Sequence, residues 1–267
     1  MMQSIKNLGL FQKAGIKDLG KRTCENCGNK VPIYEVNGKR ASICIKCEDI
    51  SIAQRVKEQI AKEDENLLKR LIEKYETIPF EERTTFRMYE PTTDIQEKAK
   101  ETALAFAKEE LKNINTLFFQ GEPGIGKTHL SHSVAEVFRY FDKSVLFIDM
   151  PSLLSKIRDS YSPGSIYSQN ELMWLIEKVE LLILDDIGAE YVRSDDGNES
   201  WVTDILYQIV NVRKGKYTVY STNYQVQGLI EKYGSLAKRI ISRMLENTQI
   251  IRLDGEDYRL KSARREL

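Results

Sequence analysis

A glycine-rich octapeptide constrains this chain more than any other feature. Residues 121–128 read Gly-Glu-Pro-Gly-Ile-Gly-Lys-Thr, which fits the pattern G-x-x-x-x-G-K-[ST]. An apolar, strand-like run precedes the octapeptide at 116–120, and a helical pattern follows at 127–141. A phosphate-binding loop requires this strand–loop–helix context, whereas a chance glycine-rich turn does not. The octapeptide therefore predicts a nucleoside triphosphate site in an α/β fold.

Each part of the octapeptide has an expected role. Gly121, Gly124 and Gly126 let backbone N–H groups close around a β-phosphate, next to the positive end of the following helix. Lys127 is expected to reach the β- and γ-phosphates, and Thr128 to offer its hydroxyl to Mg²⁺. The predicted nucleotide-binding residues in this region are Gly121, Glu122, Pro123, Gly124, Ile125, Gly126, Lys127, Thr128 and His129.

Two adjacent carboxylates follow a second apolar strand. Residues 181–184 are Leu-Leu-Ile-Leu, and Asp185 and Asp186 come next. A buried strand that ends in an acid delivers a carboxylate to the carboxyl edge of a parallel sheet, where ligands bind. Asp185 is expected to hold Mg²⁺, and Asp186 to orient or deprotonate the attacking water. Without the phosphate-binding loop, this pair would equally fit a solvated strand end.

Two more polar residues are candidate catalytic groups. Asn223 follows the apolar run at 217–221, and its amide would hold the attacking water; capping of the following helix is the alternative. Arg243 lies in a predicted helix at 235–246 and would neutralise charge on the γ-phosphate of a neighbouring subunit. A surface salt bridge is the alternative for Arg243.

Short apolar runs alternate with helical patterns from residue 97 onward. Such alternation predicts an α/β fold with a parallel sheet that is covered on both faces. The expected strands are 116–120, 144–149, 181–185, 217–221 and 248–252. The expected helices are 99–111, 127–141, 152–159, 170–179, 200–213, 226–232 and 235–246.

All four cysteines of the chain lie in one short stretch. Cys24 and Cys27 form one C-x-x-C pair, Cys44 and Cys47 form another, and sixteen residues separate the pairs. This spacing predicts a structural, four-thiolate zinc site. The intervening 30–36 run, followed by Asn-Gly, predicts a β-hairpin. Two redox pairs or a disulfide staple are the alternatives.

A helical pattern without Gly or Pro links the cysteine stretch to the α/β region. Its apolar stripe is Ile52, Val56, Ile60, Leu67, Leu71 and Tyr75. We predict a helix over 51–76, which Pro79 ends, and a connecting segment over 77–96. The expected domains are a zinc module (1–50), a helical linker (51–79) and an ATPase domain (80–267).

Composition excludes several classes of protein. The 40 Lys and Arg balance 40 Asp and Glu, which disfavours a wholly basic nucleic-acid coat protein. No apolar run approaches the ~20 residues of a membrane span, and the first residues lack the apolar block of a signal peptide. We therefore expect a cytoplasmic protein that has no membrane partner.

The order of the motifs resembles that of the AAA+ ATPases that load bacterial replicative helicases, of the DnaC and DnaI type, and their IstB-type transposition relatives. A phosphate-binding loop and a single acidic strand end occur in many ATPase families. The run Asp-Asp-Ile-Gly-Ala-Glu ending at Glu190 restricts the resemblance to this one. The resemblance covers about residues 80–260. Besides the loop, the segments that carry it are 85–91, 181–190, 221–223, 239–244 and 257–259.

The resemblance implies a fold and a set of roles. The fold would be an AAA+ core with a five-stranded parallel sheet, without the usual helical lid. By resemblance, Asn223 is the first sensor, Arg243 the arginine finger with Arg239 as a weaker candidate, and Arg259 a second sensor that contacts nucleotide. The implied catalytic residues are Lys127, Asp185, Asp186, Asn223 and Arg243, with ATP, Mg²⁺ and Zn²⁺ as cofactors.

The resemblance also implies partners. The N-terminal module would bind a hexameric replicative helicase, and the ATPase domains would self-associate around single-stranded DNA. Segment 150–164, with Lys156, Arg158 and Tyr161, occupies the place of the initiator-type insertion that contacts single-stranded DNA; an ordinary surface helix is the alternative. The main alternative is an IstB-like transposition helper that binds duplex DNA and a transposase; a small-molecule kinase and a zinc adaptor with a vestigial ATPase are further ones. The protein would act in a bacterial cell, with a chromosomal or a phage gene left open.

Overall fold

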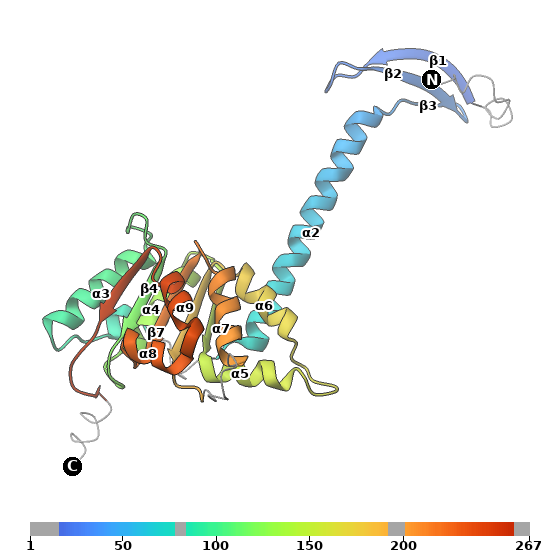
Figure 1. Ribbon diagram of the computed structural model, residues 1–267. Coiled ribbons are helices and arrows are strands. Elements are labelled where there is room, and N and C mark those ends of the chain that lie inside the picture. Colours follow the sequence, from blue (N-terminus) through green and yellow to red (C-terminus); the bar gives the residue numbers. More distant parts are fainter. Residues whose placement is uncertain (1–15, 78–83, 192–200, 259–267) are drawn as a thin grey trace. The chain divides into compact units, whose positions relative to one another are not determined.

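The computed structural model describes residues 16–77, 84–191 and 201–258. The chain divides into two compact units, with the boundary between Asn66 and Leu67. Figure 1 shows the helices and strands of both units, coloured along the sequence. In the described residues, no helix combines the length and the apolar character that crossing a membrane requires.

The first unit contains a small antiparallel sheet with the order β1-β2-β3. Its strands are β1 (Ile16–Thr23), β2 (Lys30–Val36) and β3 (Lys39–Ala41). The predicted hairpin is confirmed: Val36 pairs with Lys39, and both turn residues, Asn37 and Gly38, have positive φ, as a tight two-residue turn requires. Helix α2 (Ile45–Tyr75) begins six residues before its predicted start. The second cysteine pair therefore leads directly into the first turn of α2.

The second unit contains a five-stranded sheet with the order β5-β6-β7-β4-β8. Every neighbouring pair in it is parallel, as the alternating pattern predicted. The strands are β4 (Thr116–Gln120), β5 (Val145–Asp149), β6 (Leu181–Ile187), β7 (Tyr217–Thr222) and β8 (Thr248–Arg252). Residues of β4 and β6 are almost all buried, because helices cover both faces of the sheet.

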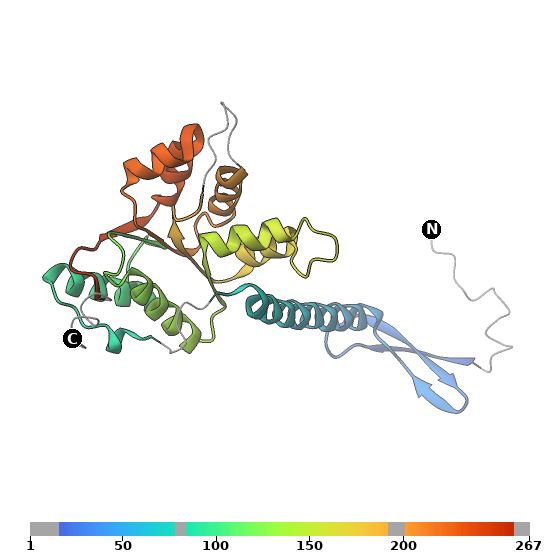
Figure 2. The same ribbon diagram turned by 90° about the horizontal axis from the view of Figure 1, so that it is seen from below.

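Each strand contributes alternate side chains to two separate cores. Phe118, Leu182 and Leu184 belong to one core, whereas Phe119 and Ile183 belong to the other. Figure 2 shows helices on both sides of the sheet. One face is covered by α3 (Asp94–Ala107) and α4 (Lys127–Tyr140). The other is covered by α5 (Met150–Asp159), α6 (Gln169–Lys178), α7 (Trp201–Val212), α8 (Val226–Tyr233) and α9 (Ala237–Met244).

Helix α3 differs from its prediction at both ends. It begins at Asp94, inside the expected connecting segment, because the Thr93 side chain caps it by accepting from the N–H of Gln96 at 3.2 Å. It ends at Ala107 rather than 111, shortly before Glu109, which has a φ of +59°. The prediction extended the connecting segment to residue 96 and missed the threonine cap at position 93.

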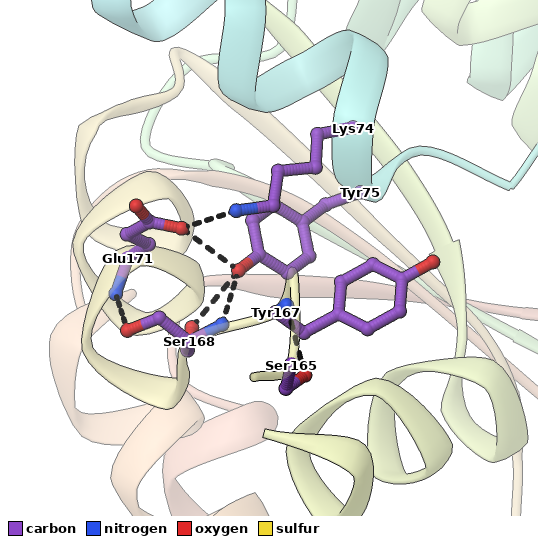
Figure 3. Close-up of polar contacts among 6 residues, drawn as sticks. All are labelled: Lys74, Tyr75, Ser165, Tyr167, Ser168 and Glu171. Atoms are coloured by element: carbon purple, nitrogen blue, oxygen red, sulfur yellow. Dashed lines mark hydrogen bonds and ion pairs between the residues drawn. The ribbon is translucent and has the colours of Figure 1, made fainter. Parts of the chain in front are cut away.

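The last turn of α2 belongs to the core of the second unit (Figure 3). Tyr75 is fully buried, and its hydroxyl accepts from the N–H of Ser168 at 2.8 Å. Lys74 forms an ion pair with Glu171 on α6 at 2.5 Å. These contacts attach the end of α2 to the start of α6.

Arg213 stabilises the carboxyl end of α6 from inside the protein. It is 2% exposed, and its guanidinium donates to the carbonyls of Ile176 at 3.0 Å and Val179 at 2.7 Å. Burial lowers the pKa of Arg213 to about 10, so the group remains charged at neutral pH.

Replacing Arg213 by methionine is expected to lower the free energy of unfolding by about 3 kcal/mol, because several buried carbonyls lose their donor. Urea unfolding would measure the change. Lys214→Met is the matched control, since its ion pair with Glu246 is exposed and is worth less than about 1 kcal/mol. Equal effects of the two substitutions would contradict the role given to Arg213.

Candidate nucleotide and metal sites

A cavity of about 400 Å³ lies beside the phosphate-binding loop, at the carboxyl edge of the sheet. It brings together the loop, the end of β6 and the end of β7, as the sequence predicted for parallel strands. Its lining residues are Met88, Tyr89, Glu90, Pro123, Gly124, Gly126, Lys127, Thr128, His129, Asp186, Asn223 and Tyr258.

Two glycines of the loop have conformations and surroundings that exclude a side chain. Gly124 and Gly126 have φ values of +75° and +95°. A Cβ atom on Gly126 would lie 2.6 Å from the Tyr89 ring, and one on Gly124 would lie 1.9 Å from an Asp257 carboxylate oxygen. The loop is therefore closely covered by segments from both ends of this unit.

The Lys127 side chain folds back over the loop. It is 5% exposed, and its ammonium donates to the carbonyls of Gly121 at 2.8 Å and Glu122 at 2.7 Å. Lys127 is also the first residue of α4, whose N-cap is Gly126. A positive charge and the N-terminus of a helix thus lie side by side, which suits an anionic phosphate.

Asp185 is held by hydroxyl groups from two other elements. Thr128 on α4 donates to its Oδ2 at 2.8 Å, and Ser221 on β7 donates to its Oδ1. Asp185 is 3% exposed, and burial raises its pKa. The two predicted Mg²⁺ ligands, Thr128 and Asp185, are therefore in direct contact. Their hard oxygen atoms are the donor type that Mg²⁺ prefers.

Asp186 and Asn223 face the same cavity. Asp186 has a φ of +52°, and its N–H donates to Ser221 Oγ at 3.0 Å. The buried Asn223 Oδ1 has no hydrogen-bond partner among the residues that the structure describes. The helix-capping alternative for Asn223 is wrong, because the N-cap of α8 is Gln225.

Aromatic residues also line the cavity. The Tyr89 and His129 rings pack edge to face with centroids 5.3 Å apart, and Tyr258 is a third aromatic lining residue. Burial lowers the pKa of His129, so its ring is neutral at pH 7. The sequence did not predict Tyr258 as a site residue. Its N–H donates to the carbonyl of Gly124 at 3.0 Å, a long-range contact that no local pattern indicates.

The candidate finger residues lie away from this cavity. Arg243 on α9 packs its guanidinium 4.9 Å from the centre of the Tyr207 ring, and Arg239 lies on the same helix. Neither arginine lines the cavity of its own chain. Arg259, predicted as a second sensor, lies outside the described residues.

The four cysteine sulfurs of the first unit converge as predicted. All four Sγ atoms lie within 4.8 Å of one another, with Cys24 and Cys47 at 3.7 Å and Cys27 and Cys44 at 3.5 Å. A zinc ion with Zn–S bonds of ~2.3 Å requires similar separations, whereas a disulfide requires ~2.05 Å. Backbone N–H groups of Cys27 and Asn26 lower the pKa of Cys24, whereas hydrogen bonds with the other cysteine sulfurs raise the pKa of Cys47. The cluster therefore fits zinc better than a disulfide staple.

We expect the full chain, purified without chelator, to contain one zinc ion per molecule, because four thiolates close the coordination shell. Metal analysis would check this number. Cys24→Ser is expected to lose the zinc, whereas Ser51→Ala, a nearby substitution on α2, is expected to retain it. Zinc-free wild-type protein would contradict the assignment.

Comparisons with known proteins agree with this architecture. A family model described as IstB-like ATP binding protein matches residues 47–266. The replicative helicase loader DnaC of Buchnera aphidicola subsp. Schizaphis graminum (strain Sg) is 28% identical over 178 residues, which cover 66% of this chain and 69% of that protein. DnaC of Escherichia coli (strain K12) is 27% identical over 184 residues, with coverages of 68% and 71%.

A solved structure of DnaI is also similar. It has a TM-score of 0.54 and 27% identity, and the match covers 66% of this chain and 90% of that structure. The family match begins at Cys47, so three of the four cysteines precede it. The fold is that of an AAA+ ATP-binding core, and the chain belongs to the IstB-like ATP-binding protein family, with similarity to the replicative helicase loader DnaC and to DnaI.

Proposed function

We propose that this protein is an Mg²⁺-dependent ATPase that loads a replicative DNA helicase onto single-stranded DNA. One observation carries the proposal: the phosphate-binding loop, Asp186 and Thr128, whose hydroxyl donates to Asp185, meet at a single cavity, in a chain whose relatives are named replicative helicase loaders. The cytoplasm of a bacterial cell is the proposed location.

Residues in and beside the cavity have separate roles in the proposed phosphoryl transfer. The Lys127 ammonium leaves the carbonyls of Gly121 and Glu122 and binds the β- and γ-phosphates, because the phosphate oxygens carry more negative charge than the carbonyl oxygens. Thr128 and Asp185 hold Mg²⁺, which neutralises charge on the phosphates. Asp186 orients the attacking water, and Asn223 offers its unpartnered amide oxygen to the same water. The neutral His129 and the Tyr89 ring face the nucleoside.

Arg243 completes the site of a neighbouring subunit in this proposal. Its helix is amphipathic, with Ile240, Ile241 and Met244 buried, while Arg239 on the same helix is exposed. An arginine supplied in trans stabilises charge on the γ-phosphate. Arg239 is the weaker candidate for this role, and Arg259 is proposed to contact the nucleotide of its own subunit.

The zinc module is proposed to bind the helicase. Residues 1–50 would form this module, 51–79 a helical linker and 80–267 the ATPase domain. Apolar side chains on the module and the N-terminal part of α2 are exposed and available to a partner. These exposed residues are Ile43, Ile45, Ile50, Ile52, Val56 and Ile60.

Single-stranded DNA is proposed to bind near the end of α5. The Lys156 ammonium lies 4.6 Å from the centre of the Tyr167 ring, and Arg158 lies 5.4 Å from that of Trp201. The Tyr161 side chain is exposed and contacts the same Trp201 ring edge to face. Aromatic faces beside positive charges suit stacked bases and a phosphate backbone.

A loading assay tests this function. The full chain is expected to bind a bacterial hexameric replicative helicase and, with ATP, to place it on single-stranded DNA coated with binding protein. Replacing Ile52 and Val56 by glutamate should abolish helicase binding, while the control Glu58→Gln on α2 should preserve it. Failure of the wild-type chain to bind or load the helicase would overturn the proposal.

A second function has its own support, because the matching family is described as IstB-like. A transposition helper would bind duplex DNA with ATP more tightly than single strands, and would bind a transposase instead of a helicase. Comparing both DNA forms in one titration separates the two functions.

A further inference from the structure

Glu190 is a buried carboxylate that does not line the nucleotide cavity. It is 6% exposed. Its Oε2 accepts from the N–H of Gly188 at 3.0 Å, and its Oε1 accepts from the hydroxyl of Tyr233. A buried carboxylate is costly unless donors compensate its charge, so these two bonds indicate a specific role.

The first bond holds the turn that carries Asp186. Gly188 lies two residues after Asp186, and the N–H of Ala189 donates to the Asp186 carbonyl at 3.0 Å. Asp186 and Gly188 both have positive φ, a conformation that is uncommon for residues other than glycine. Glu190 binds one side of this turn, while Ser221 binds the N–H of Asp186 on the other.

The second bond holds the end of α8. Tyr233 is the last residue of α8, is 5% exposed, and its carbonyl accepts from Thr203 on α7 at 3.4 Å. Burial and the adjacent Glu190 charge raise the pKa of the Tyr233 phenol, which therefore remains a donor. A short 3-10 turn, Gly234–Leu236, leads directly from Tyr233 into α9.

We propose that Glu190 is a positioning residue that fixes the Asp186 turn and the α8–α9 pair in one arrangement. The inference rests on the proposed ATPase function, because α9 carries Arg239 and Arg243. One carboxylate thus links the water-orienting group of a subunit to the arginines that it offers to its neighbour. A carboxylate suits this position because both of its oxygens accept hydrogen bonds. A Gln side chain would direct its amide NH₂ group toward one of the two donors, the Gly188 N–H or the Tyr233 hydroxyl.

Hydrogen exchange of the full chain tests the link without requiring ATP hydrolysis. Tyr233→Phe keeps the ring and removes only the hydroxyl. It is expected to raise amide exchange at Asp186 and Ala189 as well as at Gly188, whose N–H lies next to the Tyr233 hydroxyl. Glu190→Gln is expected to raise exchange both in 186–189 and in 233–244. Exchange that rises only next to the substituted residue would overturn the link.

Turnover gives the functional readout. Glu190→Gln and Tyr233→Phe are each expected to lower kcat by about 10-fold, with KM for ATP changed less than about twofold, because neither group touches the nucleotide. The double variant should be no slower than the slower single variant, since both changes break one link. Glu177→Gln, an exposed change on α6, is the control.

The two proposals fail in different ways. Wild-type kcat in both variants, in a protein that hydrolyses ATP, would overturn the role of Glu190 alone. A wild-type protein without ATPase activity would overturn the proposed function, and the exchange experiment would still decide whether Glu190 links the two segments.

Discussion

Replacing Lys127 by alanine is expected to weaken ATP binding by at least about 100-fold, or about 2.7 kcal/mol. The buried ammonium donates to two backbone carbonyls of the loop, and it exchanges these acceptors for the phosphates when ATP binds. Charge-assisted hydrogen bonds to two phosphates are worth about 1.5–3 kcal/mol each. Titration of the full chain with ATP and Mg²⁺, followed by calorimetry, measures this affinity.

Lys178→Ala is the matched control for Lys127, because Lys178 is exposed in the last turn of α6. Its ATP affinity should equal that of the wild type. An affinity of Lys127→Ala within about threefold of the wild type would show that the cavity does not bind a triphosphate in the expected way.

Replacing Asp186 by asparagine is expected to lower ATP turnover by about 100-fold or more while ATP binding is retained. The side chain faces the cavity, and the change removes the charge that would orient or deprotonate water. Asparagine is preferable to alanine here because Asp186 has a φ of +52°, a conformation that asparagine tolerates well. Steady-state phosphate release and analogue binding measure the two properties separately.

The control for Asp186 is Asp159→Asn, an exposed change at the end of α5. Its turnover should match that of the wild type. Turnover of Asp186→Asn within about twofold of the wild type would remove Asp186 from the mechanism, since general-base catalysis contributes about 10²–10⁴-fold.

Much of the fold could be predicted from the sequence because the five strands are short, apolar and separated by helical patterns. Both faces of the sheet are covered, so runs such as 181–184 are apolar without interruption. The ends of α2 and α3 were less predictable. The first N–H groups of these helices donate to the Cys44 carbonyl and to the Thr93 side chain. Hydrophobic periodicity does not detect such capping residues, because it follows only the apolar side chains.

The site was predictable where its residues are close in sequence and less so where strand order decides the contacts. The loop residues are contiguous, so one pattern predicts them together. Ser221 was not predicted, because its contact with Asp185 requires β6 and β7 to be neighbours. Glu190 was noticed only as part of a family-like run, since its partner Tyr233 lies 43 positions away.

Tyr258 is the last of the residues that line the nucleotide cavity to be synthesised. It lies beside Glu90, whose carbonyl accepts from the Tyr258 hydroxyl, although the two residues are 168 positions apart. A ribosome synthesises Glu90 long before Tyr258. The nucleotide cavity of a nascent chain therefore lacks part of its lining until Tyr258 has been synthesised.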